Sequence, residues 1–264
     1  MATQVITRVE VSDLIEKLAA ALARASQPGA VLVSNEIPLN PELHRLARLI
    51  DHTLLRPEAT QSQVERLCHD ALRFGFATAY VNPVWVSLAA RLLRGLNIRL
   101  GTVAGFPLGA STTMQKRAEA WTAICAGACE IDMVMNIGAA KSGDLDRVES
   151  DIRGVAEVCR GGGATLKVIL ENAYLTDGEK IAACRAAERA GADFVKTSTG
   201  FGPSGATPAD VRLMRQAVSP AVGIKAAGGI RTLTDALRML EAGANRLGTS
   251  AGVAILQEAA SLLV

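Results

Sequence analysis

The sequence predicts an α/β protein with the fold of a TIM (β/α)8 barrel and an N-terminal helical extension. From about residue 41 of the 264-residue chain, eight short apolar segments alternate with eight helix-like segments. The tripeptide Ala-Gly-Ala joins a helix-like segment to the next apolar segment at residues 126–128, 190–192 and 242–244, where glycine favours a left-handed helix end. Composition agrees, because 49% hydrophobic but only 3% aromatic residues are typical of parallel sheets covered by helices.

The first 40 residues differ from the rest and are predicted to form an extension with one helix. Residues 11–26 have an amphipathic pattern, with Ser12 as the N-cap and acidic residues in the first turn. Gln-Pro-Gly at 27–29 is expected to end this helix, and 31–41 is expected to be irregular. The predicted division is therefore an extension over 1–40 and a catalytic barrel over 41–264.

The elements of the barrel follow in order along the chain. Predicted strands are rich in apolar and β-branched residues and span 48–55, 76–83, 98–107, 130–138, 165–172, 193–200, 222–229 and 245–250. Predicted helices span 61–74, 84–95, 112–127, 144–160, 177–191, 208–218, 233–243 and 251–263. An open doubly wound sheet is the alternative, but no G-x-G-x-x-G motif follows the first strand, which favours the barrel.

Charge and cysteine content narrow the class of protein. A formal net charge of +2 gives no reason to expect nucleic-acid or membrane partners, and no apolar run reaches the roughly 18 residues of a membrane span. We find no secretory signal pattern at the N-terminus. The cysteines are odd in number, lack a CxxC pair and are expected to be small core residues of a cytoplasmic protein: Cys68, Cys125, Cys129, Cys159 and Cys184.

Three lysines lie in strand-like segments at equal spacing. Lys167, Lys196 and Lys225 occur in TLKVIL, DFVKTS and VGIKAA, each 29 residues after the one before. Burying a lysine is costly, and this interval is the length of one strand plus one helix, so neighbouring strands are predicted to aim the three amines at one place. Crowded amines in a dry site lose protons and become nucleophiles, which is the chemistry of a Schiff-base enzyme.

Two aspartates are expected at the same end of the barrel. Asp51 lies in the first predicted strand and Asp132 in the fourth, and side chains near the C-terminal strand ends form the active site of a TIM barrel. One strand lysine is more often a structural ion-pair partner, but three lysines with two aspartates favour catalysis. The three histidines are scattered, which argues against a metal-dependent aldolase or hydrolase.

Glycine-rich turns follow the seventh and eighth predicted strands. The first is Ala-Ala-Gly-Gly-Ile-Arg at 226–231, and the second is Gly-Thr-Ser-Ala-Gly at 248–252. Bare backbone N–H groups and helix N-termini bind anions, and TIM barrels often hold a phosphate after strands seven and eight. Such turns also serve tight packing, so it is their position in the barrel that indicates a phosphate site.

From Leu46 to its end the chain resembles deoxyribose-phosphate aldolase, a class I, Schiff-base aldolase family with a TIM-barrel fold. The matching motifs occur on most strands in the family's order and are IDHTLL, AGFPLGAST, EIDMVMNIG, LKVILE, DFVKTSTGF, GIKAAGGIRT and RLGTSAG. The resemblance implies reversible cleavage of 2-deoxy-D-ribose 5-phosphate to acetaldehyde and D-glyceraldehyde 3-phosphate in deoxyribose phosphate catabolism. It implies no metal and no organic cofactor, a small phosphosugar as partner, and a homo-oligomer, either a dimer or a tetramer.

The same resemblance assigns roles to individual residues. Lys196 matches the Schiff-base nucleophile, and Lys225 matches the cation that keeps Lys196 neutral and helps to move protons. Asp132 resembles the proton-relay carboxylate, while Lys167 and Asp51 resemble residues that contact substrate or orient the relay. The phosphate site is matched by Gly200, Gly228, Gly229 and Ser250.

Tyr80 departs from the family pattern, because many relatives carry cysteine at this point of the second strand. The end of this strand is expected to face the active site or the residues that support it.

Two other functions remain open from the sequence: a different Schiff-base barrel, such as a transaldolase-like enzyme, and a non-catalytic phosphosugar-binding barrel. Product analysis with deoxyribose 5-phosphate distinguishes a different Schiff-base enzyme from a deoxyribose-phosphate aldolase. The presence of Lys196 argues against a non-catalytic barrel.

Overall fold

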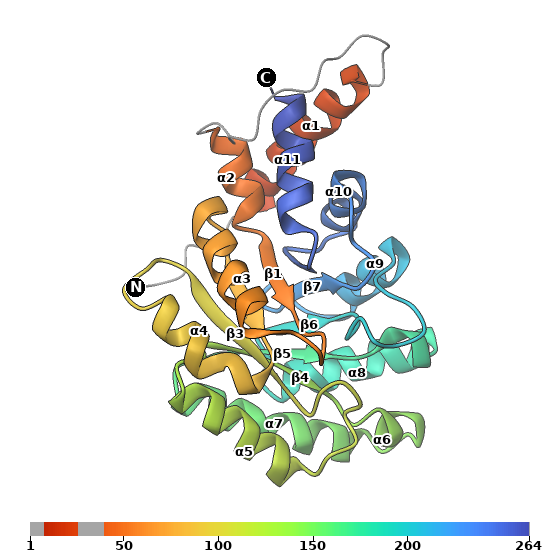
Figure 1. The fold of residues 1–264 in the computed structure, drawn as a ribbon. Helices are drawn as coiled ribbons and strands as arrows, with labels where there is room; N and C mark the ends of the chain where they lie inside the picture. Colours follow the sequence, from red (N-terminus) through yellow and green to blue (C-terminus); the bar gives the residue numbers. More distant parts are fainter. Residues whose placement is uncertain (1–7, 26–39, 264) are drawn as a thin grey trace.

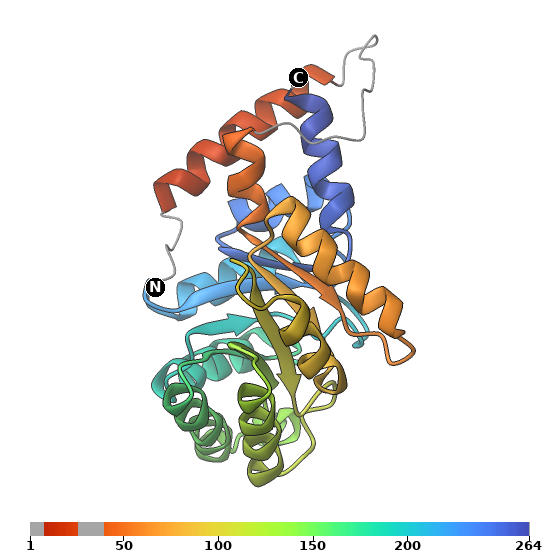
Figure 2. The same ribbon diagram turned by 60° about the vertical axis from the view of Figure 1, so that its left-hand side comes forward.

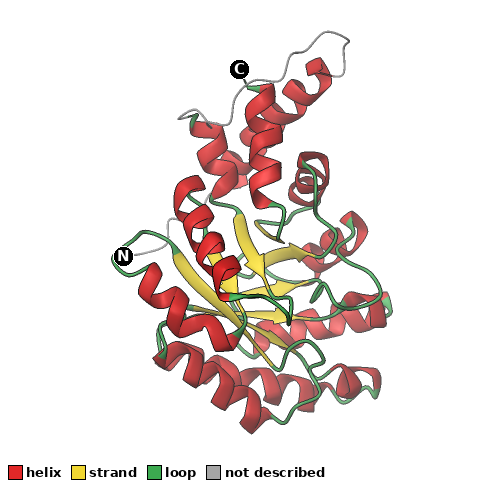
Figure 3. Ribbon diagram, in the orientation of Figure 1, coloured by secondary structure: helices red, strands yellow, loops and turns green. Residues whose placement is uncertain are grey.

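The computed structural model describes residues 8–25 and 40–263, and it confirms the predicted barrel. Eight parallel strands form a closed sheet in chain order, with β8 returning to pair with β1. Figure 3 shows the strands at the centre with the helices outside them. The strands are β1 (Ile50–Leu54), β2 (Thr78–Val81), β3 (Arg99–Ala104), β4 (Glu130–Val134), β5 (Thr165–Ile169), β6 (Phe194–Lys196), β7 (Gly223–Ala227) and β8 (Arg246–Thr249).

At least one helix follows each strand and covers the outside of the barrel (Figure 1). In chain order these are α3 (Gln61–Phe74), α4 (Val86–Leu92), α5 (Thr113–Cys125), α6 (Ile137–Lys141), α7 (Leu145–Gly161), α8 (Asp177–Arg189), α9 (Pro208–Ala217), α10 (Leu233–Glu241) and α11 (Gly252–Leu262). Two 3-10 turns, η1 (Pro83–Trp85) and η2 (Asn172–Tyr174), lie in the loops after β2 and β5. Two further helices, α1 (Arg8–Ala25) and α2 (Pro41–Ala47), precede β1.

Threonine marks where several of the covering helices begin. In α3, α5, α8 and α10 the residue before the helix is a threonine whose side chain and backbone exchange hydrogen bonds with a Gln, Glu or Asp three residues later. This capping box satisfies backbone N–H groups that the first turn leaves without partners. The loops that leave the C-terminal ends of the strands therefore have defined ends, which keeps the rim of the barrel in place.

The N-terminal part differs from the prediction in two ways. Helix α1 begins at Arg8, so Ser12 lies inside the helix and does not cap it. Helix α2 was not predicted, although Asn40 caps it and Pro41 occupies its first turn, a usual helix-start combination. The predicted break at 27–29 and the irregular residues 31–39 lie outside the described residues.

Helix α1 packs on the barrel through its apolar face. Leu14 and Leu18 are fully buried, and the helix lies across α2, α10 and α11, as Figure 2 shows. On its polar face, Lys17 forms ion pairs with Asp13 in its own helix and with Glu42 in α2.

The short helix α6, also not predicted, follows β4. Asn136 caps this helix by accepting a hydrogen bond from the Ala139 N–H.

The cysteines only partly follow the prediction of small core residues. Cys68, Cys159 and Cys184 are buried, but Cys129 is half-buried and Cys125 is exposed near the end of α5. The prediction for Cys125 was wrong because this last residue of α5 lies off the helix face formed by the buried residues Lys116, Ala120 and Ala123. Among the described residues, no helix has the length and apolar character needed to cross a membrane.

Candidate active site

The register of the strands brings the predicted lysines and aspartates to the same side of the barrel interior. Lys196 on β6 is paired directly with Lys225 on β7, and Asp132 on β4 is paired directly with Lys167 on β5. Lys167 is, however, the register partner of Phe194, which precedes Lys196 by two residues. The three equally spaced lysines therefore lie at two depths in the barrel. Lys196 and Lys225 lie nearer the C-terminal rim, and Lys167 lies deeper.

Asp132 connects the upper pair of lysines. Its Oδ2 accepts hydrogen bonds from Lys196 Nζ at 2.9 Å and from Lys225 Nζ at 2.7 Å. Lys225 Nζ also lies 2.6 Å from an oxygen of Asp51 on β1. All four side chains are at least 95% buried, so these charges interact with little screening by water.

A second group of charges lies below the first. Lys167 donates to Glu130 on β4, and its Nζ lies 3.6 Å from Asp132 and 3.9 Å from Asp51. Arg246 on β8 donates to Asp51 at 2.8 Å, and Arg99 on β3 donates to Glu130 at 2.6 Å. Ion pairs therefore fill this part of the barrel interior, and Asp51, Glu130 and Asp132 each have at least two cationic neighbours.

These contacts give the two upper lysines different proton affinities. The pKa of Lys196 falls to about 8, chiefly because of burial, with Asp132 acting in the opposite direction and Lys225 lowering it further. Burial also disfavours the charged form of Lys225, but Asp132 and Asp51 outweigh this effect and raise its pKa above the ordinary value. Burial would raise the pKa of Asp132, yet the lysines around it hold that pKa well below its usual range.

A count of charges is consistent with the lowered pKa of Lys196. The interior holds more cationic side chains than carboxylates, namely Lys167, Lys196, Lys225, Arg99 and Arg246 against Asp51, Glu130 and Asp132. Arginine does not deprotonate in proteins, so the excess positive charge is removed most easily at a lysine. Among the described residues Lys196 is within 4 Å of one carboxylate, whereas Lys225 has two and Lys167 three.

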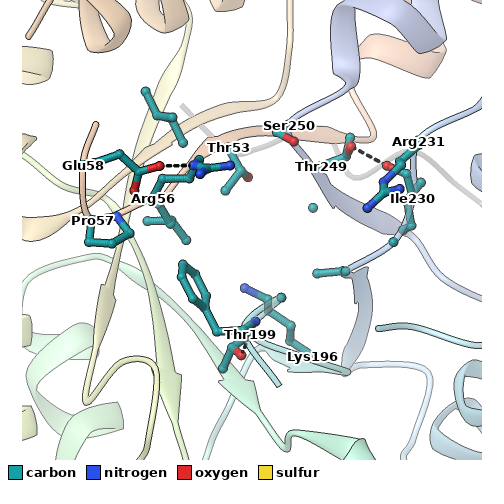
Figure 4. Close-up of a pocket in the computed structure, with 18 residues that line it drawn as sticks. Thr53, Arg56, Pro57, Glu58, Lys196, Thr199, Ile230, Arg231, Thr249 and Ser250 are labelled. Carbon is teal, nitrogen blue, oxygen red and sulfur yellow. Dashed lines mark hydrogen bonds and ion pairs between the residues drawn. The ribbon is translucent and has the colours of Figure 1, made fainter. Parts of the chain in front are cut away.

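A pocket of about 600 Å³ opens above Lys196 at the C-terminal rim. Figure 4 shows the Lys196 amine reaching into this pocket beside Thr199, with Thr249, Ser250 and Arg231 across from it. All four residues predicted for phosphate line the same pocket: Gly200, Gly228, Gly229 and Ser250. Gly228 has φ +90°, and a Cβ there would lie 2.9 Å from the Gly205 backbone, so the turn requires glycine.

Several residues of this site were not predicted from the sequence. Alternation along the strands could have indicated that two of them face the barrel interior. Glu130 lies two positions before Asp132 and so shares its strand face, and Arg246 lies two positions before Gly248. Arg231 and Arg56 add positive charge to the lining of the pocket, where Arg56 pairs with Glu58. Arg99, the first residue of β3, donates to Glu130 and was also not identified from the sequence as part of the site.

Tyr80 lies inside the charged cluster rather than at its edge. The side chain is fully buried, and its hydroxyl contacts both Asp132 and Lys167. No group of three or more His, Cys, Asp or Glu side chains suited to a metal ion occurs among residues 8–25 and 40–263.

Comparison with known proteins identifies close relatives. The sequence pattern of the DeoC/LacD family aldolases matches residues 45–258. The deoxyribose-phosphate aldolase of Thermoanaerobacter sp. (strain X514) is 53% identical over 214 residues, which cover 81% of this chain and 96% of the relative. The deoxyribose-phosphate aldolase of Streptococcus pneumoniae serotype 19F (strain G54) is 56% identical over 213 residues, with the same coverage.

Solved structures give the same result. A protein of Coccidioides immitis, proposed to be a deoxyribose-phosphate aldolase, is 42% identical and superposes with a TM-score of 0.80, covering 96% of this chain and 97% of that one. The deoxyribose phosphate aldolase of Aeropyrum pernix, described as a tetramer, is 34% identical with a TM-score of 0.77, covering 90% of this chain and 94% of that one.

Proposed function

The chain belongs to the DeoC/LacD family of aldolases, and we propose that it reversibly cleaves 2-deoxy-D-ribose 5-phosphate to acetaldehyde and D-glyceraldehyde 3-phosphate. Its relatives of more than 50% identity carry the name of this activity. The observation that supports the proposal most is the position of Lys196: its amine reaches the pocket, donates to Asp132, and has a pKa of about 8. A buried amine of this kind is a nucleophile near neutral pH.

Catalysis begins at Lys196. The neutral amine attacks the C1 aldehyde of the open-chain sugar, and loss of water gives an iminium ion. Lys225 is protonated in the resting site because Asp132 and Asp51 both stabilise its ammonium form, and its charge lowers the pKa of Lys196 by repulsion. Lys225 donates a proton to the departing hydroxyl and regains one through the relay when the C3 hydroxyl loses its proton.

Carbon–carbon cleavage follows from the iminium. A base removes the proton of the C3 hydroxyl, the C2–C3 bond breaks, and its electrons move toward the iminium nitrogen to give an enamine. The C3 carbon leaves as the aldehyde of glyceraldehyde 3-phosphate. Asp132 and Lys225, 2.7 Å apart, form the proposed proton relay, in which Asp132 acts through a water molecule. Protonation of the enamine at C2 and hydrolysis then release acetaldehyde and regenerate the Lys196 amine.

The substrate phosphate is proposed to bind at the turns after β6, β7 and β8. Gly200, Gly228, Gly229 and Ser250 line the pocket there, and Arg231 adds a cation. Backbone N–H groups without side chains in the way, together with one arginine, suit a dianion. Lys167 and Asp51 are proposed to orient the relay, because Lys167 Nζ lies 3.6 Å from Asp132 and an oxygen of Asp51 lies 2.6 Å from Lys225 Nζ. Of the five residues proposed for catalysis, only Lys196 lines the pocket.

Trapping with borohydride tests the proposal. Incubation with acetaldehyde and borohydride is expected to reduce one imine, and peptide mass mapping is expected to find it on Lys196. Lys196→Arg keeps the positive charge but removes the nucleophile, and it is expected to lose the adduct and nearly all cleavage of deoxyribose 5-phosphate. Lys141→Arg, at an exposed lysine of α6, is the matched control. An adduct mainly on Lys167 or Lys225 contradicts the assignment.

We further propose a cytoplasmic homo-oligomer, a dimer or a tetramer, acting in deoxyribose phosphate catabolism. The five free cysteines suit a reducing compartment. Residues 1–40 are proposed to be an appendage to the catalytic barrel of residues 41–264. Light scattering coupled to size-exclusion chromatography measures the oligomeric state, and a monomer at micromolar concentration contradicts the proposal.

A further inference from the structure

Tyr80 lies between the two levels of charge inside the barrel. Its hydroxyl donates to Asp132 Oδ1 at 2.7 Å and accepts a hydrogen bond from Lys167 Nζ at 2.6 Å. Asp132 is therefore held at both oxygens, by Tyr80 on one and by Lys196 and Lys225 on the other. Burial, together with the surrounding carboxylates, raises the pKa of Tyr80 well above 10, so the phenol keeps the proton that it donates.

The ring of Tyr80 contacts the lysines as well. Lys225 Nζ lies 3.8 Å from the ring centroid and Lys167 Nζ lies 5.1 Å from it, within the range of cation–π interactions. The ring thus fills the space beneath Lys225 with a surface that favours an ammonium group. Asp132 contacts only the hydroxyl and Lys225 only the ring, whereas Lys167 contacts both. Replacing tyrosine by phenylalanine removes the hydroxyl contacts and keeps the ring.

We propose that Tyr80 is a positioning residue for the aldol cleavage, which fixes Asp132 so that only one carboxylate oxygen serves Lys196 and Lys225. The inference rests on the proposed function, since it assigns Asp132 and both lysines to the reaction. A carboxylate is otherwise free to rotate about its last bond. With Oδ1 bound to Tyr80, part of the carboxylate charge is taken up by the phenol, and Lys196 is held less tightly as an ammonium ion.

The position of Tyr80 depends on a glycine of the neighbouring strand. Gly101 on β3 is the register partner of Tyr80, and a Cβ on Gly101 would lie 2.3 Å from the Tyr80 ring. Any larger residue at 101 must displace the ring and with it the hydroxyl. Gly101 therefore belongs to the positioning device, although it has no side chain of its own.

Replacing Tyr80 by phenylalanine isolates the hydroxyl from the ring. Tyr80→Phe is expected to lower kcat for deoxyribose 5-phosphate about tenfold, the lower end of what the loss of a hydrogen bond to a charged group costs, with KM changed less than about twofold. The midpoint of imine formation is expected to move about half a pH unit or more to higher pH, because Asp132 then favours the Lys196 ammonium more strongly. The other charged groups that face Tyr80 stay in place: Asp51, Glu130, Lys167, Lys225 and Arg246.

One control and a second test variant, with its own control, accompany Tyr80→Phe. Tyr174→Phe removes the hydroxyl of the half-exposed tyrosine in η2, outside the pocket lining, and is expected to leave kcat and the midpoint unchanged. Gly101→Ala is expected to reproduce the loss of kcat by displacing the ring. Gly178→Ala, at a helical glycine whose added Cβ meets no atom within 4 Å, is its matched control. Because Tyr80→Phe is nearly isosteric, it decides the question even where Gly101→Ala fails to fold.

The outcomes separate this inference from the proposed function. Absence of a borohydride adduct on Lys196 in the unmodified protein overturns the proposed function, and the positioning role falls with it. The positioning role alone is overturned if the unmodified protein forms the Lys196 adduct and Tyr80→Phe has the same kcat and the same pH midpoint of imine formation as the unmodified protein.

Discussion

Lys225 is expected to set the protonation state of Lys196 by direct repulsion. Both amines donate to Asp132 Oδ2, over 2.9 and 2.7 Å, so their nitrogens lie at most about 5.6 Å apart. At about 5 Å and an effective dielectric constant of about 20, two unit charges repel by about 3 kcal/mol. At 1.36 kcal/mol per unit, this energy corresponds to about two pH units.

Lys225→Met removes this repulsion while keeping an unbranched side chain of similar length. The pKa of Lys196, about 8 in the unmodified protein, is expected to rise by about two pH units, because the ammonium form no longer faces a like charge. The freed oxygen of Asp132 acts in the same direction. The neutral fraction of Lys196 at pH 7 then falls about a hundredfold, and imine formation slows by about the same factor.

The assay is the rate of imine formation with acetaldehyde, trapped by borohydride over a range of pH. In Lys225→Met the rate is expected to recover as the pH approaches about 10, where Lys196 again loses its proton. Lys141→Met, at an exposed lysine that pairs with Glu179, controls for loss of a positive charge elsewhere. Circular dichroism verifies the fold, because Asp51 loses one of its cations and keeps Arg246. An unshifted midpoint, or one moved to lower pH, refutes the reasoning.

Three other variants test other parts of the structure. Ser250→Asp is expected to raise KM for deoxyribose 5-phosphate at least about tenfold more than KM for deoxyribose; equal changes would place the phosphate elsewhere. Leu18→Ala, at a fully buried residue of α1, is expected to cost about 2–5 kcal/mol in urea unfolding without changing kcat, and a cost near zero would contradict the packing of α1. Burial lowers the pKa of His52 from a reference value of 6.5 to about 4. Between pH 4 and pH 6.5, the unfolded chain therefore binds more protons at His52 than the folded protein does. Stability is therefore lost as the pH falls from 6.5 to 4, and His52→Asn is expected to flatten the stability curve there; an unchanged slope in urea titrations would contradict this.

The fold could be predicted because its determinants are local. Alternation of apolar and helix-like segments follows from strand and helix periods, and each of the eight predicted strand segments contains one strand of the barrel. The short helices were missed because their start depends on one or two residues. Asn40 with Pro41, and Asn136, are caps that also occur in loops, so the sequence pattern alone does not separate the two.

The partners of the predicted lysines could be found only with the strand register. Glu130 neutralises Lys167, and Arg246 neutralises Asp51, but neither lies in a motif that marks it for catalysis. Alternation shows that Glu130 shares a face with Asp132, yet it does not show which lysine lies opposite. Tyr80 was expected at or near the site, whereas its bridge between Asp132 and Lys167 depends on the space that Gly101 leaves on the next strand.

Depth inside the barrel is the quantity that equal spacing does not give. A register shift of one residue turns a side chain to the other face of the strand, so the inward direction of the lysines is strongly constrained by burial. A shift of two residues keeps the direction and moves the side chain by about 6.6 Å along the strand. Lys167 is displaced in this way relative to Lys196, because Ile169 and not Lys167 is the register partner of Lys196. The same 29-residue interval therefore places one lysine in a deep ion pair and the next two around the Asp132 oxygen, where repulsion between them sets the proton affinity of the amine that reaches the pocket.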